Sequence, residues 1–221
     1  YMLHAPDYLG YESAISMAAN PDLLPVVQQA LRMKKIGNEL MTVIGGREIH
    51  PVSVCVGGFY AVPRPSALKA LLPELKWGLE KAIATVRWAA TLDYPDFEID
   101  YEFVSLSHPD EYPFNEGTIL SSTGLDVSME DYDKHYIEEH VAHSNALHSR
   151  RVETGSTYHV GPLARFNLNF EKLSSTVQDL AKEIDLTLPV LNPFYSLIVR
   201  SLELVQSFEE AIRLIENYKE P

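Results

Sequence analysis

Residues 192–215 read NPFYSLIVRSLELVQSFEEAIRLI and contain the clearest helical pattern of the chain. Asn192 followed by Pro193 is a typical helix start, because the amide side chain caps free backbone N–H groups and proline tolerates the first helical position. Apolar side chains then recur three and four residues apart, which places them on one face of a helix. They are Phe194, Leu197, Ile198, Leu202, Val205, Phe208, Ile212 and Ile215. We therefore predict a helix of about 25 residues whose apolar face packs against a core.

Three further segments have helical patterns. The first begins at Asn20-Pro21-Asp22 and ends at Gly45-Gly46, which have the residue types of a helix start and a helix end. The second covers residues 66–92. There Pro73 removes a backbone donor, so we predict a short turn followed by a longer helix. The third is a shorter helix over residues 174–184.

The middle of the chain has the patterns of strands and turns. Residues 97–103 alternate apolar and acidic side chains, which predicts a strand with one face in water. Residues 112–128 contain glycines and short apolar runs and are predicted to supply a partner strand. We expect a short polar helix over residues 129–143 and two strand-like pieces over residues 145–170. Residues 50–59 are too short for a helix and are predicted to form a buried loop or a short strand.

This order of elements predicts an α+β fold that is mainly helical, with long helices packed around a small antiparallel β section. The chain has 221 residues, 46% of them hydrophobic, which is enough to bury a core. No apolar run is long enough for a transmembrane helix. The single cysteine, Cys55, excludes a disulfide framework and any all-cysteine metal site built within this chain.

The net charge of −13 is unevenly distributed along the chain. Residues 93–139 hold fourteen acidic side chains and one basic side chain, Lys134, while the rest of the chain is neutral overall. A strongly acidic total argues against nucleic-acid binding, which needs clustered Lys and Arg. The acidic section is interpreted as a solvated surface, or alternatively as a surface that attracts a basic partner subunit or a cation.

Four histidines lie close together in the sequence: His135, His140, His143 and His148. If residues 129–143 form a helix, His140 and His143 share one face of it. A metal site needs three or four ligands that converge on one point. The spacing of these histidines does not match known zinc-binding patterns. We interpret the histidines as structural or incidental. A stand-alone metal-binding module built on them is kept as an alternative.

Cys55 and His50 together have the residue types of a thiol nucleophile and its base. A separation of five residues places them on opposite faces of an extended segment. The apolar neighbours Val54 and Val56 are also expected to raise the pKa of the thiol rather than lower it. The sequence therefore favours a buried, unreactive cysteine.

Two runs punctuated by Gly and Pro enclose isolated polar side chains. Residues 45–60 read GGREIHPVSVCVGGFY, and residues 158–168 read YHVGPLARFNL. Composition alone predicts tight turns around satisfied polar groups in a core. At these runs, at 96–103, at 143–147 and at the helix start 192–194, the chain resembles the large (alpha) subunit of nickel–iron hydrogenases. It is most similar to the cytoplasmic, cofactor-coupled branch that includes sulfhydrogenase-like and NAD(P)- or deazaflavin-reducing enzymes.

The resemblance implies reversible oxidation of dihydrogen at a nickel–iron centre held by two C-x-x-C pairs, one near each end of the subunit. Neither pair is present here, and Cys55 matches no ligand position. The resemblance therefore identifies residues 1–221 as the central region of a large-subunit domain that lacks both terminal ligand segments. The chain alone is expected to bind no cofactor and to be inactive, with no catalytic or metal-ligating residue of its own.

The resemblance also implies where this region contributes to the parent protein. It gives scaffold and part of the cavity wall, where His50, Pro51, Gly57, Gly58 and Arg165 lie near the metal without binding it. Electron-transfer subunits together with an iron–sulfur small subunit are the implied partners, and the implied location is the cytoplasm. The alternative is a non-catalytic, metal-free paralogue, or a split scaffold or interaction unit, with the same fold.

Overall fold

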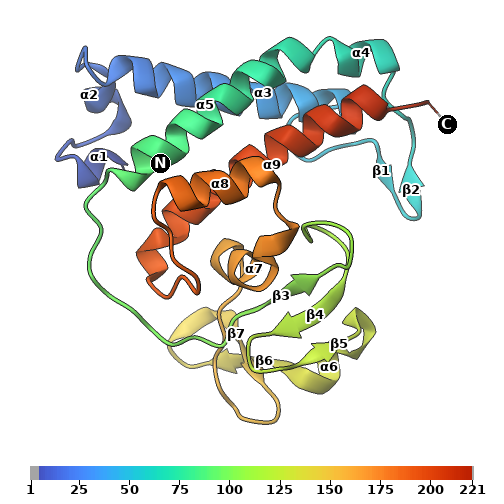
Figure 1. The fold of residues 1–221 in the computed structure, drawn as a ribbon. Helices are drawn as coiled ribbons and strands as arrows, with labels where there is room; N and C mark the ends of the chain where they lie inside the picture. Colours follow the sequence, from blue (N-terminus) through green and yellow to red (C-terminus); the bar gives the residue numbers. More distant parts are fainter. Residues whose placement is uncertain (1–4, 221) are drawn as a thin grey trace. The chain divides into compact units, whose positions relative to one another are not determined.

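The computed structural model describes residues 5–220, drawn in Figure 1. It is 49% helical and 14% strand, which confirms the predicted α+β, mainly helical fold. The chain divides into two compact units. Unit 1 contains the chain up to Lys81 together with the part from Ser207 onward, and unit 2 contains Ala82–Gln206. Within the described residues, no helix combines the length and the apolar character needed to cross a membrane.

Unit 1 is built on one whole long helix, α3, and on parts of two others, α5 and α9. Its elements are α1 (Ala5–Tyr8), α2 (Ala14–Ala18), α3 (Leu24–Gly45), β1 (Val54–Cys55), β2 (Gly58–Phe59), α4 (Pro65–Lys69), the first part of α5 (Leu72–Ala90) and the last part of α9 (Ser196–Asn217). Tyr218, after α9, donates a hydrogen bond to the carbonyl oxygen of Pro63 (3.0 Å). Lys76 of α5 forms an ion pair with Glu216 of α9 (2.9 Å). These contacts connect α9 to α5 and to the segment before α4.

α5 and α9 approach closely within unit 1 because a glycine faces a phenylalanine. A Cβ atom added to Gly78 would lie 2.4 Å from Cε1 of Phe208, so any side chain at Gly78 would collide with that ring. Pro73 lies in the first turn of α5. Backbone N–H groups in the first turn form no hydrogen bond within the helix, so proline costs none there. The predicted short turn followed by a longer helix is therefore confirmed as α4 and α5.

Unit 2 combines small antiparallel sheets with helices. β3 (Val104–Ser107), β4 (Thr118–Ser121) and β5 (Asp126–Val127) form a sheet in that order, and β6 (Tyr136–Val141) pairs with β7 (Ser144–Arg151). The helical elements are η1 (Met129–Asp131), α6 (Tyr132–His135), α7 (Pro162–Asn169), η2 (Phe170–Lys172), α8 (Ser175–Glu183), η3 (Pro193–Tyr195) and the adjoining parts of α5 and α9.

The long helices lie close to the predicted positions. The Asn192 side chain accepts a hydrogen bond from the backbone N–H of Phe194, and α9 follows η3. Leu202 and Val205 of its apolar face are fully buried, whereas Phe194 is exposed. α3 begins at Leu24, later than predicted, because Leu23 and Leu24 both donate to the carbonyl of Asn20 and form a turn first.

Three predictions in the middle of the chain are wrong in whole or in part. Residues 97–102 form no strand, and pairing begins only with a bridge at Phe103 and then β3. An alternating pattern describes an extended chain, but no neighbouring strand pairs with this part of it. The predicted helix over residues 129–143 ends at His135, because residues 136–141 pair with β7 as β6. Of the two strand-like pieces over 145–170, the first is β7 and the second contains only a bridge at His159 before α7.

Candidate functional site

The loop after α3 carries His50 and Pro51. Gly46 ends α3 in the left-handed conformation (φ 83°), which turns the chain back toward the helix end. The carbonyl oxygen of Gly45 then accepts hydrogen bonds from the backbone N–H groups of Val52 (2.8 Å) and Ser53 (3.1 Å). Arg47 donates through Nε to the carbonyl of His50 (2.5 Å). The loop is therefore held by its own backbone, and the imidazole of His50 is exposed.

Val56 and Gly57 form the turn of the β1–β2 hairpin, and Gly58 is the first residue of β2. Val54 pairs with Phe59, and Cys55 pairs with Gly58. Both glycines have positive φ angles, 85° and 154°, which a side chain would disfavour. The predicted short strand is confirmed, but the predicted burial is wrong. Each strand has only two residues, and the hairpin cannot cover its own side chains. Both glycines are exposed.

The described residues do not fit a nickel–iron centre by themselves. Such a centre takes soft thiolate ligands, and Cys55 is the only cysteine of the sequence. Its side chain is half-buried in β1. In residues 5–220, no three side chains of the His, Cys, Asp and Glu types form a group that could hold a metal. Any thiolate ligands of such a centre would have to come from outside this sequence.

The four histidines do not share a helix face. His135 ends α6, His140 lies in β6, His143 follows β6 and His148 lies in β7. The rings of His143 and His148 meet edge to face with centroids 5.2 Å apart. The prediction that His140 and His143 share one helix face is wrong, because the chain is already extended after His135.

Arg165 lies in α7 and forms a partly buried ion pair. Its Nε and Nη2 donate to the two carboxylate oxygens of Glu203 in α9, at 2.7 and 3.0 Å. The phenol of Tyr112 donates to Oε1 of the same carboxylate at 2.7 Å. Glu203 is 7% exposed and Tyr112 is 4% exposed. The three side chains therefore satisfy one another inside unit 2; we call them the Glu203 cluster.

The pKa values within the Glu203 cluster are consistent with a neutral phenol beside an ion pair. Burial raises the pKa of Tyr112, and the charge of Glu203 and its hydrogen bond raise it further. Burial lowers the pKa of Arg165, but the hydrogen bond and the charge of Glu203 raise it by more. The interpretation from composition, a satisfied polar side chain in the core, therefore describes the contacts of Arg165.

Sequence reasoning missed Glu203 and Tyr112. Glu203 lies on the predicted apolar helix, where Leu202, Leu204 and Val205 surround it. A lone carboxylate in such a stretch is a signal for a buried partner, because an unpaired charge is costly to bury. Tyr112 carries no comparable signal.

Unit 2 contains a second ion pair, more deeply buried, between Arg151 of β7 and Glu102. The distance from Nη1 to Oε1 is 2.5 Å, and the side chains are 6% and 12% exposed. Thr123 also donates to this carboxylate at 2.9 Å. The pair lies at a polar pocket of about 630 Å³ that also contains Asp100 and Glu153. Asp100 and Glu102 belong to the acidic section predicted from the sequence, whereas Glu153 lies outside it.

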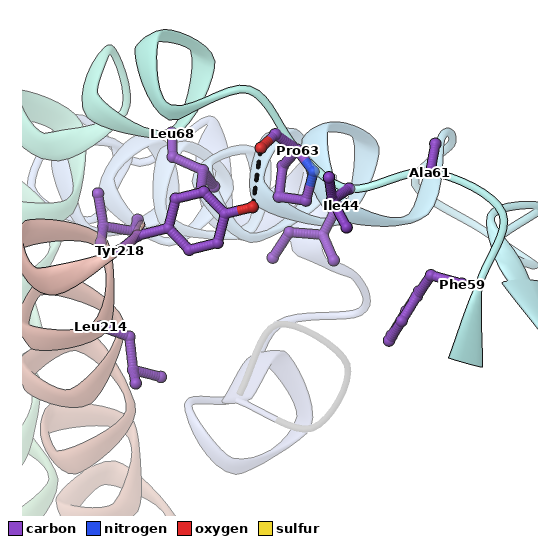
Figure 2. A pocket seen from close by; sticks show the side chains of 9 residues that line it. Ile44, Phe59, Ala61, Pro63, Leu68, Leu214 and Tyr218 are labelled. Atoms are coloured by element: carbon purple, nitrogen blue, oxygen red, sulfur yellow. Dashed lines mark hydrogen bonds between the residues drawn. The ribbon is translucent and has the colours of Figure 1, made fainter. Parts of the chain in front are cut away.

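Unit 1 contains an apolar groove of about 320 Å³. Figure 2 shows Tyr218 with its hydroxyl bonded to Pro63, Leu214 on α9, and Phe59 on the hairpin side of the groove. Ile44, at the end of α3, and Leu68, in α4, also line it. The lining is almost entirely hydrocarbon, so the groove suits an apolar side chain rather than a charged ligand.

Comparisons with curated proteins relate this chain to hydrogenase subunits. No protein-family model matches it. It is 31% identical over 219 residues to the alpha subunit of sulfhydrogenase 1 of Pyrococcus furiosus. This alignment covers 98% of this chain and 50% of the relative. It is 27% identical to the alpha subunit of sulfhydrogenase 2 of the same organism, over 98% of this chain and 49% of the relative. It is also 27% identical to a polypeptide of the F420-non-reducing hydrogenase vhu of Methanocaldococcus jannaschii, over 98% of this chain and 57% of that polypeptide.

Solved structures share the fold. A NAD+-reducing [NiFe]-hydrogenase in the H2-reduced state superposes with a TM-score of 0.73 at 20% identity, covering 97% of this chain and 54% of that one. A Dm. baculatum [NiFeSe]-hydrogenase gives a TM-score of 0.59 at 18% identity, covering 97% and 53%. The chain thus spans about half the length of the proteins that it matches. The resemblance drawn from residues 45–60 and 158–168 is confirmed: this chain is a relative of hydrogenase alpha subunits and has the fold of nickel–iron hydrogenase large subunits.

Proposed function

We propose that this chain is part of a hydrogenase catalytic subunit that reversibly oxidises dihydrogen at a nickel–iron centre, and that it supplies scaffold and cavity wall. The observation that carries the proposal is the similarity to the alpha subunit of sulfhydrogenase 1 over 98% of the chain. Because only half of that relative is matched, the activity is proposed for the protein to which these residues contribute.

In this proposal the chain's residues hold the wall in place and take no part in the chemistry. The His50 loop is fixed by the bonds to Gly45 and by Arg47. Beyond it, Gly57 lies in the hairpin turn and Gly58 begins β2, both with positive φ angles. Arg165 is held by two hydrogen bonds to Glu203. Since the described residues do not fit the metal centre, we assign no chemical step to any of these side chains.

The proposal extends to partners. The relatives are named as alpha subunits, which supports assembly with further subunits. Among these we include electron-transfer subunits together with an iron–sulfur small subunit, and we place the assembly in the cytoplasm. Dihydrogen is the proposed substrate of the parent protein. We do not propose nucleic acid as a partner, because the net charge of the chain is acidic.

The test is made on the protein expressed from its complete reading frame in its native host. The proposal expects a C-x-x-C pair encoded before Tyr1 and another after Pro221, and hydrogen-dependent reduction of a viologen dye by the purified protein. A reading frame without these pairs would exclude catalysis by the parent protein.

A metal-free paralogue, or a split scaffold or interaction unit of the same fold, is the second candidate. The observation that favours it is the single cysteine, Cys55, in a chain similar to hydrogenase subunits along nearly its whole length. This candidate expects the purified protein to contain neither nickel nor iron and to show no hydrogen-dependent dye reduction.

A further inference from the structure

The segment between Glu48 and Arg64 has the composition of a protein core. Residues 49–63, here called the hairpin segment, contain no Asp, Glu, Lys or Arg. Surface segments of a monomeric protein normally carry charges among their apolar residues. The hairpin segment lacks such charges, and it includes β1, β2 and the loop with His50.

The structure nevertheless places the hairpin segment on the surface of unit 1. Val56 is fully exposed, Tyr60 is 78% exposed and Phe59 is 59% exposed. Further side chains that are at least 48% exposed are Ile49, Val52, Val54 and Val62. These exposed apolar side chains gather on one short segment, here called the apolar patch, and large exposed apolar patches mark surfaces that another polypeptide covers.

The groove of unit 1 continues this patch toward the helices. Phe59 and Val62 belong to both, and Leu214 of α9 is 53% exposed on the opposite wall. The hydroxyl of Tyr218 is bonded to Pro63, which leaves the groove surface apolar. Figure 2 shows Phe59 and Leu214 facing the open space between the hairpin and α9.

The hairpin itself would also gain stability from a covering layer. An isolated two-stranded hairpin is marginally stable in water, and here each strand has only two residues. Its backbone is ordered by the bonds to Gly45 and by the bond from Tyr60 to Ser53 (2.7 Å). A second apolar surface against Val56 and Phe59 would stabilise the arrangement.

We propose that the hairpin segment and the groove together form the surface on which the polypeptide corresponding to the unmatched half of the alpha-subunit relatives packs. The inference rests on the proposed function. The relatives contain about as much chain again outside the matched part, since this chain covers 50% and 49% of two of them. An uncharged surface with an apolar groove requires an occupant that presents aliphatic or aromatic side chains. A core-forming segment of the same subunit meets this requirement, whereas a solvated charged surface does not.

The test places a photo-crosslinking residue on this surface in the protein produced from its complete reading frame in its native host. Val56→p-benzoylphenylalanine is the test variant, and Tyr60 offers a second position on the same segment. Ile15→p-benzoylphenylalanine is the matched control, because Ile15 is an apolar residue of unit 1 that is 84% exposed in α2. Crosslinked peptides are identified by mass spectrometry after irradiation.

We expect Val56 to crosslink to peptides that align with the unmatched half of the relatives, at a yield at least tenfold above that of Ile15. Crosslinks to a second copy of residues 1–221, crosslinks to another protein, or a yield equal to the control would overturn the inference. Nickel is measured on the same sample. Expected crosslinks without nickel would overturn the proposed function alone, and nickel without the crosslinks would overturn this inference alone.

Discussion

The hairpin segment and the middle of α9 reverse the usual relation between composition and burial. The hairpin segment carries no acidic or basic side chain and exposes Val56 and Phe59. α9 is apolar around Glu203 and buries that carboxylate. The difference lies in the partners: Arg165 and Tyr112 compensate Glu203, whereas within residues 5–220 no layer covers the hairpin segment. Burial follows from available partners as much as from residue type.

The largest effect is expected from removing the charge of Glu203. Glu203→Ala leaves Arg165 partly buried without its counter-ion, and breaking a buried pair in this way typically costs 3–5 kcal/mol. Because the Arg165 side chain is 23% exposed, we expect the lower end, a loss of about 3 kcal/mol in the free energy of unfolding. Urea denaturation measures it.

The matched control is an exposed pair with the same geometry. Arg87 and Glu183 meet at 2.7 and 3.0 Å, as Arg165 and Glu203 do, but their side chains are 56% and 48% exposed. Glu183→Ala should leave the urea midpoint nearly unchanged, because exposed pairs contribute little. Equal losses for the two variants would show that burial does not set the value of the Arg165 pair.

A smaller loss is expected from the packed part of unit 1. Gly78→Ala forces a Cβ atom against the ring of Phe208, so we expect a loss of about 2 kcal/mol from overpacking. Gly37→Ala in α3 is the control, since nothing lies within 4 Å of its added Cβ. There alanine should stabilise the helix by about 0.5–1 kcal/mol. Thermal unfolding of both variants tests whether unit 1 is tightly packed away from the hairpin segment.

Tyr112→Phe removes one hydrogen bond from the Glu203 cluster. A hydrogen bond to a charged group contributes about 1.5 kcal/mol, and we expect a loss of that size near pH 7. The raised pKa of Tyr112 adds a pH dependence. Above about pH 10 the phenol ionises in the unfolded chain but not in the folded one, which lowers the stability of the native sequence.

The stability difference between the native sequence and Tyr112→Phe should therefore narrow as the pH rises above about 10. The other tyrosines are common to both proteins, so their titration cancels in the difference. Urea denaturation at a series of pH values measures this difference, and a constant difference would contradict a raised pKa at Tyr112.

The smallest effect is expected at the tip of the hairpin. Val56 is fully exposed, so Val56→Ser in the 221-residue chain should change the free energy of unfolding by no more than about 0.5 kcal/mol. Urea denaturation under the conditions used for Glu203→Ala gives the comparison. A loss near that of Glu203→Ala would mean that another part of the chain covers the hairpin segment, and the contrast between the two regions would disappear.

The sequence predicted the parts of the fold that depend on local patterns. Asn192 and the apolar face that follows it specified α9, and Ser174 caps α8 through its side chain as a helix start should. Residues 97–103 were mispredicted because alternation cannot show whether a partner strand exists. Residues 136–141 were mispredicted because their pairing with β7 outweighs a weak helical pattern.

The candidate site was less accessible to pattern reasoning. The resemblance pointed to His50 and Arg165, but the partners of Arg165 are distant in the sequence: Glu203 is 38 residues away, and Tyr112 is 91 residues from Glu203. Such pairs arise only when the fold brings their elements together. Whether His50, Pro51, Gly57, Gly58 and Arg165 lie near a metal cavity stays a prediction.

Nickel analysis of the protein purified from its native host, expressed from the complete reading frame, tests the proposed function most directly. If these residues form the scaffold of a hydrogenase catalytic subunit, nickel should be present in stoichiometric amount and should remain with the protein through denaturant-free purification. A protein that is folded, assembled with its partners and free of nickel would contradict the proposal and establish the metal-free alternative.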